Sequence, residues 1–218
     1  MKSHNLWEVD MLALPLVFLI LATGLNALTI KSNHMTMSRE SNFDKAVTVV
    51  LENEGKLNRH KYDKGGVTNY GISLRYLQLV ELDLNLDGKV NVEDILTIDS
   101  VIAAQIYKRE WWDRYRYGEI KNLNIAIKIF DMSVWMGASQ AHKLLQISIN
   151  RIESPPIQVD GVLGTVTLGK VNSLIYNNKV KALLGELRDN SVHFIINLVA
   201  DDNKLIGFRD GWLKRAGK

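Results

Sequence analysis

Three acids and a threonine surround a run of glycines in the stretch ENEGKLNRHKYDKGGVTNYG, which runs from Glu52 to Gly71. Glu54 is followed nine residues later by Asp63 and five residues after that by Thr68. Hydrolysis of a glycosidic bond needs one carboxylic acid that protonates the leaving oxygen and a second group that directs water or stabilises the developing cation. These three residues supply such groups. A solvated surface loop of the same composition is the alternative.

A helix and a hairpin must hold these groups. Ser41 and Asp44 have the spacing of an N-terminal capping pair, so a helix should begin there and end near Gly55. Its apolar residues share one helical face: Phe43, Ala46, Val47, Val50 and Leu51. The glycines at 65, 66 and 71 predict a hairpin or tight loop after the helix.

Glu54 then stands at the C-terminus of a helix, where the helix dipole is negative. That position, together with partial burial, favours the protonated carboxyl that a general acid requires. Asp63, held on the loop, could orient water, and the Thr68 hydroxyl could complete the contact. Glu52 precedes Glu54 by two residues, which is about 200° around a helix, so we expect it to point away.

The same stretch resembles a known family. LENEG and YDKGGVTNYGIS are similar to the signature of the glycoside hydrolase 108 family of N-acetylmuramidases, found among phage endolysins: E-G-G, then D-P-G-G-x-T-x-x-G-I-[ST]. The resemblance implies Glu54 as general acid, Asp63 as the water-directing carboxylate and Thr68 as its partner. Two positions depart from the signature: Lys56 replaces a glycine and Lys64 replaces the proline. Neither departure removes a functional group, but both change loop stiffness and add charge.

A second motif, DLNLDGKVNVED, begins like a calcium-binding loop. Asp83, Asn85 and Asp87 stand at positions 1, 3 and 5, a glycine stands at position 6, and Asp94 replaces the usual glutamate at position 12. The predicted ligands are the side chains of Asp83, Asn85, Asp87 and Asp94 and the carbonyl of Lys89, with Asn91 adding a water contact. We expect Ca²⁺ as a structural clip, with no cofactor required for catalysis. A metal-free turn of the same shape is the alternative.

The segment from Met11 to Ile30 contains twenty residues without a charge. That is about the minimum for a helix that crosses a bilayer core of roughly 30 Å. The preceding residues carry Glu8 and Asp10 against Lys2, unlike the basic start of a cleavable signal peptide. The segment also contains residues that weaken its preference for lipid: Pro15, Thr23, Gly24 and Asn26. These features predict a marginally held transmembrane helix.

Composition excludes several classes of protein. The chain has 218 residues, of which 46% are hydrophobic and 23% charged, so it can bury a sizeable core. Cysteine is absent, which excludes disulfides, thiol catalysis and cysteine-ligated zinc. The net charge of +3 is too small to indicate a nucleic-acid partner. We expect a monomer.

Helical patterns cover most of the remaining chain. The predicted helices are Ser73 to Leu82, Thr97 to Trp112, Leu123 to Met136, Ser139 to Arg151, Thr165 to Tyr176 and Val180 to Val199, before a basic and aromatic tail. The aromatic residues of IYKREWWDRYRYGEI suit either a sugar-binding platform or core packing. The histidines have no ligand spacing and are expected at the surface; they are His4, His34, His60, His142 and His193.

The C-terminal half resembles the peptidoglycan-binding module that accompanies this catalytic domain. The resemblance rests on IFDMSVWMGASQAHKLLQ and VDGVLGTVTLGKVN, in which a turn at Asp160 and Gly161 precedes a helix expected to be capped by threonine. Trp135 stands where the family usually has asparagine. The predicted domains are therefore a signal-anchor segment and linker (1–37), a muramidase domain (38–118) and a peptidoglycan-binding domain (119–218).

The predicted fold class is α+β and predominantly α-helical: a lysozyme-like catalytic lobe with a small β-hairpin, a helical C-terminal lobe and an N-terminal transmembrane helix. The resemblance implies an endolysin that hydrolyses the β-1,4 bond between N-acetylmuramic acid and N-acetylglucosamine in peptidoglycan. The N-terminal segment resembles that of signal-arrest-release endolysins, which implies location at the host inner membrane and then, after release, in the periplasm. The alternatives are a lytic transglycosylase and a catalytically dead, membrane-anchored wall-binding protein.

Overall fold

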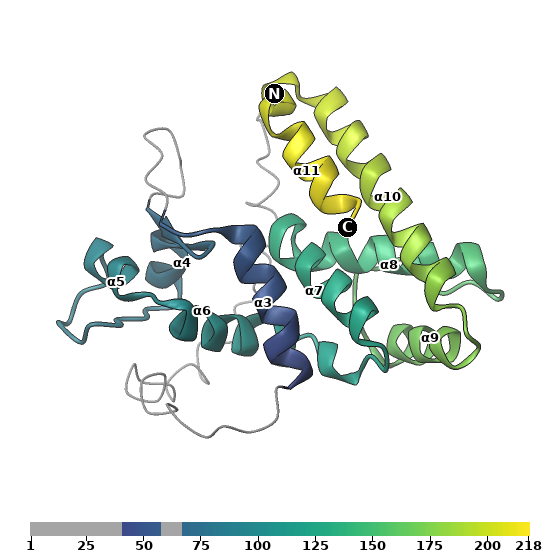
Figure 1. Cartoon of the computed structure of the whole chain (residues 1–218), viewed down its shortest axis with the longest axis horizontal. Coiled ribbons are helices and arrows are strands. Elements are labelled where there is room, and N and C mark those ends of the chain that lie inside the picture. The colour runs from purple at the N-terminus through teal and green to yellow at the C-terminus, as the bar shows by residue number, and fades with distance from the viewer. Residues whose placement is uncertain (1–40, 58–66) are drawn as a thin grey trace. The chain divides into compact units, whose positions relative to one another are not determined.

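The computed structural model describes residues 41–57 and 67–218 (Figure 1). The chain divides into two compact units, and the boundary falls after Glu110. We call the described residues up to Glu110 the N-terminal unit and residues 111–218 the C-terminal unit. The predicted membrane-spanning segment, Met11 to Ile30, lies outside the described residues. Within the described part of the chain, no helix is both long enough and apolar enough to cross a membrane.

The N-terminal unit consists of one long helix, a hairpin and three shorter helices. In chain order they are α3 (Asn42–Glu54), β1 (Thr68–Asn69), β2 (Ile72–Ser73), α4 (Leu74–Leu79), α5 (Val92–Thr97) and α6 (Ser100–Tyr107). A π-helix, η2 (Lys108–Asp113), follows α6 directly and contains the boundary between the units.

Helix α3 begins and ends where the sequence predicts. The Asp44 amide donates a hydrogen bond to the Ser41 hydroxyl (3.2 Å), and the Ser41 amide donates to Asp44 Oδ2 (2.7 Å), which is a complete capping box. Its buried side chains are Phe43, Ala46, Val47 and Val50, and this helix packs against α6. Burial of each large apolar side chain contributes roughly 1.5–3 kcal/mol, so packing of this face fixes the helix that carries Glu54.

The hairpin is a two-stranded antiparallel sheet in which Thr68 pairs with Ser73 and Asn69 pairs with Ile72. A two-residue turn, Tyr70 and Gly71, joins the strands. The hairpin leads directly into α4, whose N-cap is Ser73: the Tyr76 amide donates to the Ser73 hydroxyl at 3.1 Å.

The helix predicted around Thr97 to Trp112 is present as α6 followed by η2, but it begins at Ser100. The separate helix α5 that precedes it was not predicted, and the chain breaks between α5 and α6. The break is explained by Asp99, whose Oδ1 accepts hydrogen bonds from the amides of Val101 (2.9 Å) and Ile102 (2.8 Å). An aspartate that caps the next helix ends the previous one, because its own backbone is extended.

The C-terminal unit is helical, as predicted. After η3 (Tyr117–Glu119) come α7 (Leu123–Met136), α8 (Ala138–Ile152), α9 (Thr165–Tyr176), α10 (Val180–Asp201), η4 (Asn203–Phe208) and α11 (Arg209–Ala216). The sequence analysis assigned the residues of α11 to a tail and predicted no element at η4. They fold back so that α11 lies beside α10 (Figure 1), and a buried cluster of Ile195, Val199 and Ala216 joins the two helices.

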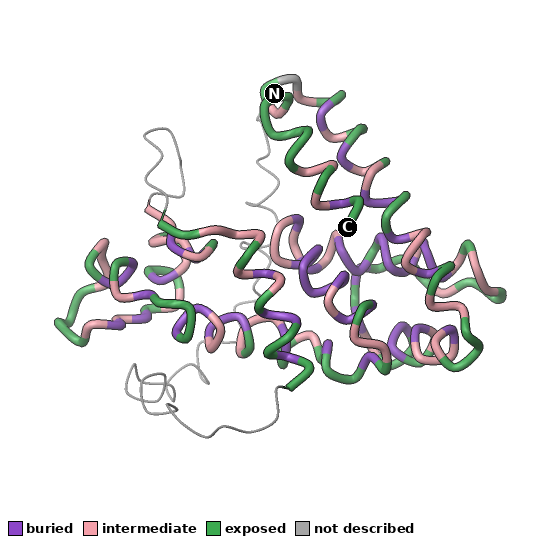
Figure 2. Tube along the Cα trace, viewed as in Figure 1, coloured by how far each residue is buried: buried purple, intermediate pink, exposed green. Residues whose placement is uncertain are grey.

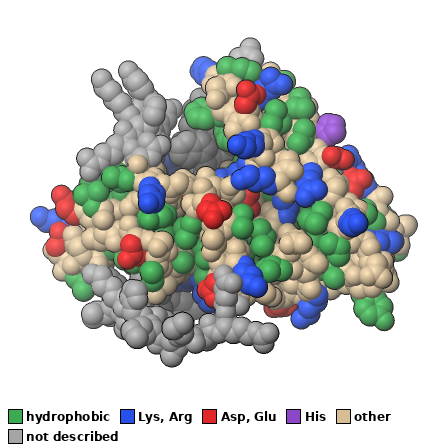
Figure 3. All heavy atoms as spheres, in the orientation of Figure 1, with side chains coloured by type: hydrophobic (Ala, Val, Ile, Leu, Met, Phe, Trp, Pro, Cys, Tyr) green, Lys and Arg blue, Asp and Glu red, His purple; other side chains and the backbone are tan. Residues whose placement is uncertain are grey.

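Buried residues line the facing sides of α7, α8 and α10 (Figure 2). They include Ile125, Ile129, Phe130, Met132, Leu144, Leu145, Ile149, Leu183 and Leu187. At the surface, Figure 3 shows Lys and Arg side chains lying among acidic and hydrophobic ones on the visible face. The mainly helical α+β prediction with one small hairpin is confirmed for the described residues.

Candidate functional site

Glu54 is the last residue of α3, as its assignment as an acid requires. The amide of the next residue, Gly55, donates to the carbonyl of Leu51 at 3.2 Å and ends the helix. Glu54 is half-buried, and its Oε1 atom is closed off from solvent. Burial and the negative end of the helix dipole both act against the charged form of a carboxyl group.

The hairpin turn lies directly against this carboxyl group. A Cβ atom built on Gly71 would stand 2.7 Å from Oε2 and 2.9 Å from Cγ of Glu54, closer than real Cβ atoms approach. Gly71 also has a φ of +77°, in the left-handed region that favours glycine. Glycine is therefore required here both for the turn and for the close approach to Glu54.

Thr68 stands at the start of β1 and is half-buried. Because the turn of the same hairpin contacts Glu54, the fold brings the threonine strand to the C-terminal end of α3. Asp63 and Lys64 lie outside the described residues. The roles of Glu54, Asp63 and Thr68 stay predictions.

Tyr107 is a residue of this site that the sequence analysis placed only among candidate aromatics. Its side chain is 1% exposed, and its hydroxyl donates to the carbonyl of Tyr70 at 3.0 Å. The same Cβ built on Gly71 would lie 2.6 Å from the Tyr107 hydroxyl. The hydroxyl and the Glu54 carboxyl thus border the same turn. Helical periodicity indicates that Tyr107 is buried, but no local signal shows which backbone group it meets.

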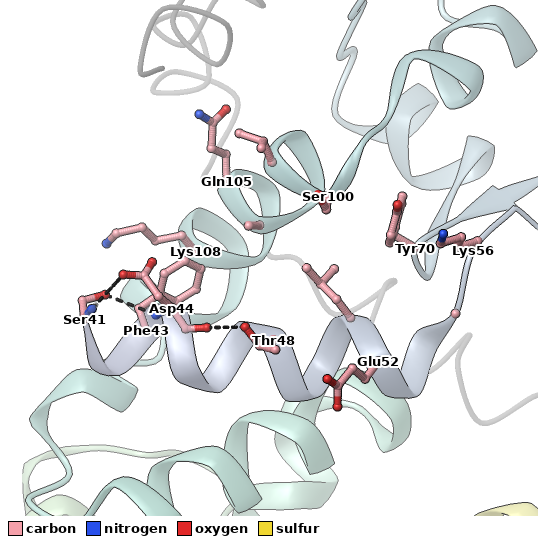
Figure 4. A pocket seen from close by; sticks show the side chains of 14 residues that line it. Ser41, Phe43, Asp44, Thr48, Glu52, Lys56, Tyr70, Ser100, Gln105 and Lys108 are labelled. Atoms are coloured by element: carbon pink, nitrogen blue, oxygen red, sulfur yellow. Dashed lines mark hydrogen bonds between the residues drawn. The ribbon is translucent and has the colours of Figure 1, made fainter. Parts of the chain in front are cut away.

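A cavity of about 830 Å³ lies beside α3 and α6 (Figure 4). Glu52, Lys56 and Tyr70 are among its lining residues, and Glu54 is not. The two glutamates therefore face different surroundings, as their spacing on the helix predicts. Lys56, the first departure from the family signature, is exposed at the rim of this cavity.

A polar cluster joins α4 to η2 in the N-terminal unit. The Arg109 guanidinium donates to the Glu110 carboxylate through Nε and to the Tyr76 hydroxyl (3.5 Å) through Nη2. Burial, with the nearby negative charge of Glu110, raises the pKa of Tyr76. The phenol therefore stays neutral and serves as a hydrogen-bonding group rather than as a base.

The acidic loop between α4 and α5 is shaped by its own amides. Both oxygens of Asp83 accept: Oδ1 from the Leu86 amide at 2.7 Å and Oδ2 from the Gly88 amide at 2.8 Å. Asp94 is fully buried, and its carboxylate accepts from the amides of Leu84 (2.7 Å) and Asn91 (2.8 Å). The loop thus holds its shape through Asx-type turns.

The predicted calcium ligands fit this loop only in part. Asp87 and Asn85 also accept backbone amides, from Lys89 and Asp87 respectively, each at 2.9 Å. Among the described residues, no group of three or more Asp, Glu, His or Cys side chains is placed to hold a metal ion. Ca²⁺ would therefore depend on the amide oxygen of Asn85 and the carbonyl of Lys89. Calcium binding stays a prediction.

Three of the candidate platform aromatics belong to the interior. Tyr107 packs in the N-terminal unit, while Trp112 and Tyr117 are buried in the C-terminal unit. The Trp112 ring lies edge-on to Phe130 at 5.5 Å between centroids. Core packing accounts for these three residues; Trp111 and Tyr115 are half-exposed.

The prediction that all histidines lie at the surface is wrong for His142, which is 2% exposed. Its Nε2 pairs with the Tyr117 hydroxyl at 2.9 Å and its Nδ1 with the Gly161 carbonyl at 3.1 Å. Burial lowers the pKa of His142 to about 4. The neutral ring therefore donates from Nδ1, accepts at Nε2 and serves as a structural crosslink.

The turn at Asp160 and Gly161 is fixed by Gln146 of α8. The Gln146 amide nitrogen donates to Asp160 Oδ1 (2.7 Å), and its oxygen accepts from the Gly161 amide (2.8 Å). The expected threonine cap on the following helix is wrong. Gly164 is the N-cap, without a side-chain hydrogen bond, and Thr165 is the first residue of α9.

Trp135 makes no polar contact of the kind that asparagine could make at this position. Its Nε1 atom is buried and has no hydrogen-bond partner among the described residues. Its ring instead lies beneath the guanidinium of Arg215, at 5.8 Å. Arg215 forms an ion pair with Asp131 at 2.8 Å, so Trp135 helps to hold α11 on α7.

Comparison with known proteins supports a glycoside hydrolase. Residues 47–137 match the family model described as glycosyl hydrolase 108, a range that contains Glu54 and Thr68 and continues to the end of α7. Twelve chains of solved structures match. One is that of SagA from Brucella abortus, with 25% identity and a TM-score of 0.61 over 80% of this chain and 88% of that chain. No curated protein matches the chain.

Proposed function

We propose that this protein is an N-acetylmuramidase that hydrolyses the β-1,4 bond between N-acetylmuramic acid and N-acetylglucosamine in peptidoglycan. The observation that carries the proposal is the setting of Glu54: a half-buried carboxyl at a helix C-terminus, in contact with the turn of the hairpin that bears Thr68. The family match, which supports a peptidoglycan-hydrolysing glycosidase, adds the substrate class.

In the proposed reaction Glu54 gives its proton to the glycosidic oxygen as the bond to C1 of N-acetylmuramic acid breaks. Asp63 stabilises the positive charge that develops at C1 and directs a water molecule to that carbon, and Thr68 supports Asp63. The water passes one proton to the Asp63 carboxylate as its oxygen bonds to C1, and proton exchange with solvent then restores protonated Glu54 and ionised Asp63. The products are an N-acetylmuramic acid with a free reducing end and an N-acetylglucosamine with a free 4-hydroxyl.

A lytic transglycosylase uses a similar acid but closes the 6-hydroxyl of N-acetylmuramic acid onto C1, so no water is consumed. Digestion of purified peptidoglycan in ¹⁸O-labelled water separates the two reactions by mass spectrometry. We expect reducing muramic ends that carry one ¹⁸O atom. Unlabelled 1,6-anhydro products would establish the transglycosylase. A preparation that binds the wall and releases no fragments would establish the dead binding protein.

We further propose that the chain acts as an endolysin, tethered to the inner membrane by Met11 to Ile30 and then released into the periplasm. The support is the uncharged length of this segment together with its lipid-disfavoured residues. Protease protection in spheroplasts, compared before and after membrane depolarisation, tests release. Full wall-degrading activity of the tethered form would contradict activation by release.

A further inference from the structure

The hairpin turn beside Glu54 has an unusual residue in it. Tyr70 and Gly71 are the two central residues of the turn, and both have positive φ, at +49° and +77°. Two-residue turns of this hand fit hairpins well, but they favour Asn, Asp or Gly at both positions. A tyrosine in this conformation is strained because its Cβ crowds the backbone, so other contacts must hold the turn in place.

Two buried side chains supply those contacts. The Tyr107 hydroxyl donates to the carbonyl of Tyr70 at 3.0 Å. In the residue before the turn, the side-chain amide nitrogen (Nδ2) of Asn69 donates to the backbone carbonyls of Ile98 (2.8 Å) and Ile95 (3.3 Å). Tyr107 belongs to α6, which packs against α3. The turn is thereby tied to the helix that packs against the acid's own helix.

The hydrogen bond from Tyr107 lies on the same side of the turn as the Glu54 carboxyl. The Tyr107 hydroxyl and the Glu54 Oε2 atom both crowd the position that a side chain at Gly71 would take, at 2.6 Å and 2.7 Å. A small movement of the turn away from Tyr107 would therefore open the Oε2 side of the carboxyl to water. It would also displace β1 and Thr68.

We propose that Tyr107 is a positioning residue for Glu54: its hydroxyl holds the strained turn against the carboxyl, which keeps the acid shielded and Thr68 in place. The inference rests on the proposed function of Glu54 as general acid. Tyr107 acts through the turn and is not itself a catalytic residue. The opposing account is that Tyr107 is an ordinary core tyrosine whose hydroxyl only satisfies a backbone carbonyl.

Tyr107→Phe tests the proposal because it removes one hydroxyl and keeps the ring. The matched control is Tyr117→Phe, which removes an equally buried hydroxyl, bonded to His142 at 2.9 Å in the C-terminal unit. Both variants should lose similar stability. Only Tyr107→Phe should lose kcat, by about 10- to 100-fold with KM within about twofold, since small displacements of a catalytic group have effects of that size. The basic limb of the pH profile of kcat should move to lower pH in Tyr107→Phe, because a Glu54 carboxyl exposed to water loses its proton more readily.

A carbon-13 titration of the Glu54 side-chain carboxyl provides a readout that needs no activity. The pH at the midpoint of this titration should be lower in Tyr107→Phe than in the wild type, and it should be unchanged in Tyr117→Phe. If Tyr107→Phe does not fold, Gly71→Ala probes the same contact, since it inserts a methyl between the hydroxyl and Oε2; we expect the same loss of kcat. Its control is Gly137→Ala, which places the same methyl at a glycine of similar φ (+86°) between α7 and α8.

The positioning role is overturned if Tyr107→Phe has wild-type kcat and an unchanged titration midpoint for Glu54. If Tyr107→Phe does not fold, wild-type kcat in Gly71→Ala overturns it instead. Either result leaves the muramidase proposal intact. A wild-type enzyme that releases no peptidoglycan fragments would overturn the proposed function. In that case the midpoint measurement still decides whether Tyr107 controls the environment of Glu54.

Discussion

Acid should weaken the C-terminal unit through His142. The ring is buried and neutral between Tyr117 and Gly161, and burial lowers its pKa to about 4. In the unfolded chain the pKa is about 6.5. Protonation therefore favours the unfolded state. The stability linked to the neutral ring is fully present above about pH 6.5 and is lost as the pH falls towards 4.

The size of the effect follows from the difference between the two pKa values. Each unit corresponds to about 1.4 kcal/mol, so the whole window spans about 3 kcal/mol, of which about 2 kcal/mol falls between pH 7 and pH 4.5. Urea unfolding followed by circular dichroism at several pH values measures it. Carboxylates also contribute to the slope, so the informative quantity is the difference between variants.

His142→Gln should be less stable than wild type at pH 7 and should show a pH slope flatter by about 2 kcal/mol over this range. His193→Gln is the matched control, because His193 is exposed on α10; its slope should equal that of wild type. A His142→Gln slope as steep as that of wild type would refute the assignment of a buried, neutral ring.

Two further outcomes are expected. Ca²⁺ at about 100 times its dissociation constant should stabilise the protein by about 3 kcal/mol through the acidic loop, measured as a higher Tm in Ca²⁺ than in EDTA. Equal Tm values in Ca²⁺ and EDTA, or a Tm increase by Ca²⁺ that Asp87→Ala does not reduce, would argue for a metal-free turn. Asp131→Asn should cost about 3 kcal/mol or more, because it leaves the Arg215 guanidinium, 14% exposed in its ion pair, without its charge partner. Urea unfolding reads this loss directly, and a loss below about 1 kcal/mol would contradict it.

The sequence was most informative where local rules decide the structure. The capping box at Ser41 and Asp44 and the apolar face of α3 depend on residues within one helix, so they could be read directly. The placement of Glu54 at the helix end followed from these signals. The bounds of α7 and α9 were also predicted correctly, from periodicity between clear breaks.

Long-range contacts were the part that could not be predicted. The Tyr107 hydroxyl meets the carbonyl of Tyr70, which is 37 residues away in the chain, and nothing in either segment indicates the pairing. The burial of His142 likewise depends on Tyr117 and on the loop at Gly161. Helix α11 was assigned to a tail because its short, charged segment contains Gly211 and is followed by Gly217, whereas its packing against α10 makes it helical.

The central claim is that Glu54 is the general acid, and Glu54→Gln tests it most directly, with Glu52→Gln as the matched control on the same helix. Glutamine keeps the size of the side chain but cannot donate a carboxyl proton. We predict that release of reducing ends from purified peptidoglycan falls at least about 100-fold in Glu54→Gln, the lower range for loss of acid catalysis, and stays near wild type in Glu52→Gln. Unchanged release by a folded Glu54→Gln protein would contradict the account.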